Sequence, residues 1–136
     1  MTIDGTQDRW SRHERRALLV LRVSIGVFTY GTVVHILQIL SAPADPYPTV
    51  PTWLAVFFTS LVVLDPMCAI LLWWRHRAGV VIGAAVLSLD AIANAYANYF
   101  LDNASGLTIG RVAPVPIALL ALLLAYCGRV HWSRLA

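Results

Sequence analysis

The sequence predicts an all-α integral membrane protein, a four-helix transmembrane bundle with both termini on the cytoplasmic side. Three observations support this prediction: a shortage of charge, four long apolar segments, and arginines gathered at alternate connections. The chain of 136 residues is 59% hydrophobic and only 12% charged, whereas soluble domains carry about 25% charged residues. A water-soluble particle of this size could not bury so many apolar side chains, so a lipid bilayer is the expected surrounding.

Each of the four apolar segments is close to the length of a membrane span. A spanning helix needs about 20 apolar residues, because each advances about 1.5 Å through a hydrocarbon core of about 30 Å. Helices are expected because backbone amides in hydrocarbon must be bonded within the segment. The predicted spans are residues 17–40, 53–74, 78–101 and about 112–127, which form a single transmembrane domain over residues 1–136.

The connections between the spans carry residues that end helices. Four prolines lie in the first connection, residues 41–51, and exclude a continuous helix there. The second connection is the tight basic turn 75–77, and the third, residues 102–110, is polar and contains glycine. The apolar run of the first span is 24 residues long, more than the 7–15 typical of a signal peptide. We therefore expect it to be retained as a helix.

The ten basic residues are all arginines, and their placement predicts the orientation. Eight of them lie in the two tails and the second connection, one is Arg111 in the third connection, and Arg22 lies inside the first span. The positive-inside rule places both termini and the tight turn in the cytoplasm. An arginine cluster beside an apolar segment marks a membrane side, and nucleic acid is not an expected partner. The arginine-only, alanine-rich usage fits a GC-rich bacterium and hence its inner membrane.

Polar residues within the spans are the candidates for function. Ionisable groups there cost about 2.5–3.5 kcal/mol on insertion scales, so they are seldom present without a role. The candidate ligand or proton site consists of His35, Asp65, Asp90, Asn94 and Asn98. No catalytic residue, cofactor site or metal site is predicted, because Cys68 and Cys127 form no CxxC pair and no nucleophile or cofactor motif is present.

The third helix places several of these residues on one face. Gly79 and Gly83 form a GxxxG step, which lets another helix approach closely. At 100° per residue they share an arc of roughly 100° with Asp90, Asn94 and Asn98. The asparagines are interpreted either as a ladder of interhelical hydrogen bonds or as the lining of a polar pocket, and Asp90 favours the pocket.

On the second helix, Asp65 precedes Pro66, which removes a backbone hydrogen bond and predicts a kink. Asp65 and Asp90 are expected at similar depth. Two carboxylates in a low dielectric cannot both ionise cheaply, so we expect at least one to hold its proton near neutral pH. On the first helix, His35 shares a face with Gly31 and Gln38, and we expect it level with Asn94 and Asn98 and able to bond their amides.

The segment Arg22-Val-Ser-Ile-Gly26, followed by Gly31 and His35, resembles the first helix of DoxX-type four-helix membrane proteins, and the turn 75–77 fits the same layout. Asp65-Pro66 and Asp90-Ala-Ile-Ala-Asn94 depart from that pattern. They are more similar to a set of small bacterial inner-membrane proteins with Asp-Pro in the second helix and Asp-x-x-x-Asn in the third. The resemblance implies the four-helix layout and carries over no activity and no functional residue.

Two functions are consistent with the sequence. In the first, the five polar residues bind or move a proton, a cation or a small ligand, and a conducting form would be a homo-oligomer. In the second, the chain is a structural or accessory subunit, the polar residues hold its helices together, and the GxxxG face meets a membrane partner. An enzyme acting by acid–base chemistry on a lipid-soluble substrate is a third option with less support.

Overall fold

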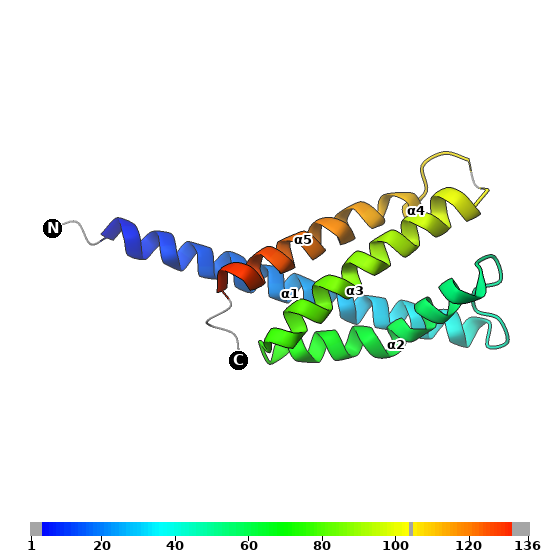
Figure 1. The fold of residues 1–136 in the computed structure, drawn as a ribbon, viewed down its shortest axis with the longest axis horizontal. Coiled ribbons are helices and arrows are strands. Elements are labelled where there is room, and N and C mark those ends of the chain that lie inside the picture. Colours follow the sequence, from blue (N-terminus) through cyan, green and yellow to red (C-terminus); the bar gives the residue numbers. More distant parts are fainter. Residues whose placement is uncertain (1–3, 104, 132–136) are drawn as a thin grey trace.

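In the computed structural model, which describes residues 4–103 and 105–131, the regular secondary structure of these residues is helical throughout (Figure 1). The helices are α1 (Asp4–Ser41), α2 (Thr52–Trp73), α3 (Arg77–Tyr96), the π-helical turn η1 (Ala97–Leu101), α4 (Ile109–Val112) and α5 (Pro114–His131). The all-α prediction is confirmed for the part of the chain that the structure describes.

Four helical segments in the described chain are long and apolar enough to cross a membrane. They are Glu14–Ser41, Thr52–Trp73, Arg77–Leu101 and Ile109–Val130. The first three agree with the predicted spans to within a few residues. The fourth, predicted at about 112–127, is longer at both ends, because the short helix α4 precedes Pro114 and helical backbone continues past Cys127.

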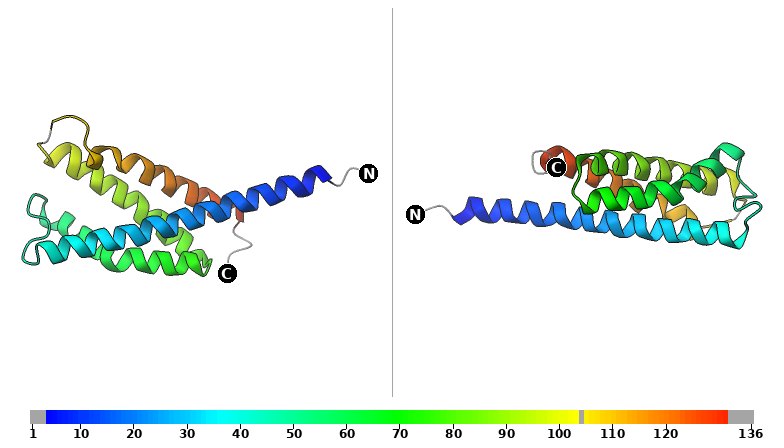
Figure 2. Two further views of the ribbon diagram at one scale, coloured as in Figure 1. Left: turned by 180° about the vertical axis from the view of Figure 1, so that it is seen from behind. Right: turned by 90° about the horizontal axis from the view of Figure 1, so that it is seen from below.

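Helix α1 begins much earlier than the predicted first span. It has 38 residues and is therefore about 57 Å long, and Figure 2 shows its N-terminal part projecting beyond the other helices. The apolar pattern marks only the part of a helix that can enter a bilayer. The preceding polar residues also favour helix, since Gln, Glu and Arg have good propensity and Asp8 precedes Arg12 by four positions.

The helices pack in the order α1, α2, α3 and α5, and a smaller contact between α5 and α1 closes the bundle. Its interior is apolar, with Phe28, Leu54, Leu61 and Leu124 almost inaccessible. Large apolar side chains also cover the outside: Tyr30, Val63, Ile92 and Leu122 are each more than 60% exposed. Apolar surface on this scale is what a lipid-facing bundle requires.

The bundle has two ends, which are named here by their connections. The turn end holds the tight link between α2 and α3, and the loop end holds the connections 42–51 and 102–108. At the turn end Arg75 has a positive φ of 53°, and the amide of His76 donates to the Leu71 carbonyl at 2.9 Å. This compact reversal lays α3 directly against α2.

Gly79 and Gly83 lie at different interfaces inside the bundle. A Cβ added to Gly79 would lie 2.7–2.8 Å from backbone atoms of Leu71 and Leu72, so α2 and α3 are in contact through their main chains. A Cβ added to Gly83 would lie 3.3 Å from the side chains of Phe28 and Leu124. Both glycines are buried, so their faces are covered by this chain's own helices.

Candidate functional site

Asp65 occupies a niche between α2 and α1. The residue is only 5% exposed, and its carboxyl oxygen Oδ2 lies against Gly31 so closely that a Cβ at that position would overlap it. The Asp65 side chain makes no hydrogen bond to any residue that the structure describes. Helix α2 continues through Pro66 as one helical element. The carboxyl group therefore lies in the packed interior without a hydrogen-bond donor among the described residues.

Asp90 on α3 is the second carboxyl group of the site. It is half-buried, and Asn94 Nδ2 donates to its Oδ1 at 2.8 Å and to its backbone carbonyl at 3.0 Å. Asp90 and Asp65 are close enough to interact electrostatically. The structure therefore pairs Asp90 with Asn94 and leaves Asp65 within electrostatic range of Asp90, with the amide donor directed at Asp90 alone.

His35 belongs to a polar cluster nearer the loop end. It follows Gly31 by one helical turn, so it lies just beyond Asp65 along α1. Its Nδ1 lies 3.1 Å from Gln38 Oε1 and 3.1 Å from the Tyr47 hydroxyl, and that hydroxyl donates to Gln38 Oε1 at 3.0 Å. Phe58 packs on both rings, with centroid distances of 6.2 Å to His35 and 5.3 Å to Tyr47.

The contact with Gln38 favours one tautomer of the neutral histidine. Gln38 Oε1 can only accept, so the ring is expected to carry its hydrogen on Nδ1. The lone pair is then on Nε2, which has no hydrogen-bond partner among the described residues. His35 is therefore a base whose accepting atom is free to take a proton or a donor group.

Tyr47 links this cluster to the carboxyl pair. It comes from the first connection but is only 9% exposed. Burial raises the pKa of the Tyr47 phenol, and the nearby carboxyl of Asp90 raises it further. Sequence reasoning missed Tyr47. The available signal was its position between Pro46 and Pro48, which stiffen the chain and leave an aromatic side chain at a constrained point.

His35 was predicted to bond the amides of Asn94 and Asn98, but its hydrogen bonds go to Gln38 and Tyr47 instead. The reason is that the first connection folds back over α1 and presents Tyr47 to the ring. Asn98 lies in a separate group of contacts near the loop end, with Arg111 and Gly110. Its backbone carbonyl accepts from Arg111 Nε at 2.9 Å, its Nδ2 donates to the Asn94 carbonyl at 2.8 Å, and its side chain packs against Gly110.

Other chemistry-bearing groups are dispersed. Among residues 4–103 and 105–131 there is no group of three His, Cys, Asp or Glu side chains that could hold a metal ion. Cys68 is buried in the core and Cys127 is half-buried, both as free thiols. The Ser24 hydroxyl is fully buried, and it has no hydrogen-bond partner in the described part of the chain.

Comparisons of the chain with protein-family models, with curated proteins and with solved structures give no match.

Proposed function

We propose that this chain is a multi-pass membrane protein whose bundle binds a proton at the Asp65–Asp90 pair and exchanges it with the loop end past His35 and Tyr47. The observation that carries the proposal is the environment of Asp65. Its carboxyl group is enclosed by α1 and α2, has no hydrogen-bond donor among the described residues, and is within electrostatic range of a second carboxyl group, that of Asp90. Two such groups repel each other in a low dielectric, and a shared proton removes the repulsion.

A proton fits this pair better than a divalent metal ion. Calcium and magnesium require six or more oxygen ligands in total, whereas the described residues contain no cluster of three or more metal-binding side chains. The Asn94 amide donates to Asp90 Oδ1, so this oxygen already has an N–H partner and is less available as a ligand for a metal ion. We therefore assign a proton, and not a divalent metal ion, as the ligand of the Asp65–Asp90 pair.

The route to the surface is provided by the column on α1. Gly31, His35 and Gln38 recur at positions i, i+4 and i+7 and so share one face of the helix. On this face of α1, Gly31 contacts Asp65, and His35 follows one turn nearer the loop end. Tyr47 contacts His35 from the first connection. The free Nε2 of His35 can accept a proton, and the Tyr47 hydroxyl can both donate and accept.

Two observations favour this site over the accessory-subunit alternative. First, the amide donors of Asn94 and Asn98 bond to residues one turn earlier in the continuous segment formed by α3 and η1, so they do not tie one spanning helix to another. Second, Gly79 and Gly83 are covered by α1, α2 and α5 of the same chain, so the GxxxG face offers no free surface to a partner helix. Both observations therefore favour a binding role for the polar residues over a role in holding helices together.

Infrared titration of the protein in lipid vesicles tests the proton site. In the wild type, a protonated carboxyl band should be present at neutral pH. Asp65→Asn or Asp90→Asn keeps the shape of the side chain and removes one of the two carboxyl groups, so each variant should shift or abolish this band. The matched control is Asp45→Asn, because Asp45 is exposed in the first connection. A spectrum without a protonated band at neutral pH, or a band unchanged in both site variants, contradicts the proposal.

We also propose that the turn end, with both termini, faces the cytoplasm of a bacterial inner membrane, and that the loop end faces outward. Single cysteines at Asp45, His76, Ser105 and Ser133, introduced after replacing Cys68 and Cys127 by alanine, test this orientation. A membrane-impermeant thiol reagent applied to intact cells should label the sites at 45 and 105 and leave those at 76 and 133 unlabelled until the cells are opened. Labelling at 76 or 133 in intact cells contradicts the orientation.

A further inference from the structure

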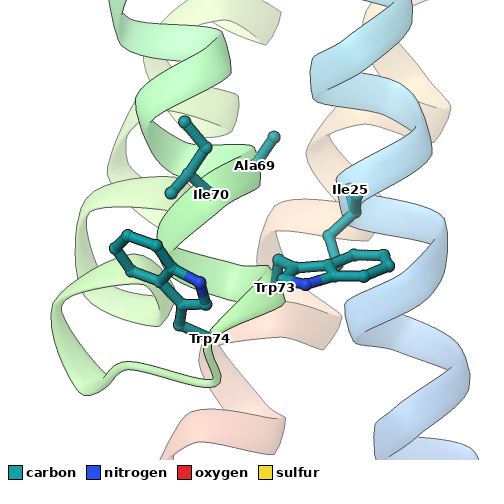
Figure 3. Close-up of a pocket in the computed structure, with 5 residues that line it drawn as sticks. All are labelled: Ile25, Ala69, Ile70, Trp73 and Trp74. Atoms are coloured by element: carbon teal, nitrogen blue, oxygen red, sulfur yellow. The ribbon is translucent and has the colours of Figure 1, made fainter.

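An apolar groove lies between α1 and α2 near the turn end. It has a volume of about 370 Å³ and is lined by Ile25, Ala69, Ile70, Trp73 and Trp74 (Figure 3). This volume is within the range of ligand-binding pockets, about 300–1,000 Å³. Trp73 is 74% exposed and Trp74 is 68% exposed, so the two indoles form the rim. Every lining side chain is suited to hydrocarbon.

Two arginines, Arg22 and Arg75, are close in sequence to the lining residues of this groove, on the side of the turn end. Arg22 precedes Ile25 by three residues, so it lies one turn closer to the helix N-terminus on an adjoining part of the same face. Side chains on a helix lean toward its N-terminus, which directs Arg22 toward the turn end. Arg75 follows Trp74 directly. Both arginines are exposed, and neither guanidinium has an ion pair or hydrogen bond with a described residue.

We infer that this groove binds a phospholipid with an anionic headgroup. The acyl chain lies along Ile25, Ala69 and Ile70, and the phosphate is held by Arg22 and Arg75. Guanidinium groups match phosphate oxygens in a bidentate geometry, and tryptophan is favoured at the boundary between hydrocarbon and headgroups. The inference depends on insertion of the four helices in a bilayer, and it is independent of the proton site.

The positive charge of Arg22 and Arg75 favours an anionic lipid over a second copy of this chain as the occupant of the groove. The two free guanidinium groups would repel the same groove of a second copy of this chain. A zwitterionic headgroup carries its own cation beside the phosphate, whereas a phosphatidylglycerol headgroup does not. An anionic lipid therefore gains from both arginines, and a basic residue near a membrane surface favours anionic lipid by up to roughly fivefold.

Quenching of Trp73 by brominated lipids measures the occupancy directly. The full chain is prepared with Trp10, Trp53, Trp74 and Trp132 replaced by phenylalanine, so that Trp73 is the remaining fluorophore. It is placed in vesicles of equal parts phosphatidylglycerol and phosphatidylcholine, with bromine on the acyl chains of one lipid or the other. Brominated phosphatidylglycerol should quench Trp73 with a site preference of roughly fivefold over phosphatidylcholine.

The double variant Arg22→Gln/Arg75→Gln should reduce this preference to about one, because the phosphate ligands are gone. The control Arg129→Gln removes an exposed arginine from the last helix at the same end of the bundle and should keep the preference. Equal quenching by the two lipids, an unchanged preference in the double variant, or an equal loss in Arg129→Gln would overturn the inference. Quenching by neither lipid would also overturn it, because protein would then cover the groove.

Discussion

Replacing Gly79 by alanine should destabilise the bundle by about 2 kcal/mol, even though alanine gains about 1 kcal/mol in helix propensity. The new methyl group would lie 2.7 Å from the carbonyl carbon of Leu71 and 2.8 Å from the amide nitrogen of Leu72. These are main-chain atoms at the end of α2, and they cannot turn away as a side chain would. The helices α2 and α3 would have to separate at the tight turn.

The control for this prediction is Gly83→Ala, four residues further along the same helix. Its Cβ would meet the ends of two side chains, Leu124 and Phe28, both at 3.3 Å, so small rotations can accommodate it. We expect a change within about 1 kcal/mol of zero, whereas Gly83→Leu should disrupt the folding of the bundle because the added volume is far larger. Unfolding of purified variants in one detergent measures all three. Equal stability of Gly79→Ala and Gly83→Ala would contradict main-chain contact at Gly79.

Gly31→Ala should displace Asp65 and cost about 2 kcal/mol, since the added methyl group overlaps Asp65 Oδ2. The Asp65 side chain would have to rotate away from α1 and leave its present contact. The protonated carboxyl band of the wild-type protein should therefore shift or vanish in this variant. Infrared spectra and detergent unfolding, measured on the same samples, check both effects.

A double-mutant cycle separates this contact from general effects at the two positions. In an Asp65→Ala background the carboxyl group is absent, so Gly31→Ala should cost less than about 0.5 kcal/mol. The difference between the two backgrounds is the coupling between Gly31 and Asp65. If Gly31→Ala costs the same in both backgrounds, or leaves the carboxyl band of the wild-type protein unchanged, the niche for Asp65 is not formed by Gly31.

The contacts at Gly79 and Gly31 determine different properties of the bundle interior. The main-chain contact at Gly79 sets how closely α2 and α3 approach, and the contact at Gly31 sets where the Asp65 carboxyl group lies. Asp65 is carried by α2 and Asp90 by α3. A change in the α2–α3 distance should therefore also alter the interaction between the two carboxyl groups, so Gly79→Ala is expected to perturb the infrared band as well.

The four apolar helices could be read from the sequence because the requirement for a span is local. Apolar length, proline in the first connection and the short basic turn are properties of consecutive residues. The same holds for Asp65 and Asp90 as unusual residues within spans. By contrast, the helical extension of α1 before residue 14 carries no apolar signal, so the criterion that located the spans did not detect it.

Only the tertiary structure decided which polar groups meet. Asp65 lies against Gly31 because α1 and α2 pack at that register, and no feature of either segment alone specifies it. Tyr47 reaches His35 because the first connection folds back over the bundle, which brings together residues twelve positions apart. Asn98 shares a helix face with Asp90, but its backbone carbonyl accepts a hydrogen bond from Arg111 near the loop end. Contacts between side chains of different helices depend on how those helices pack in space. The sequence pattern shows only which residues share a face of the same helix.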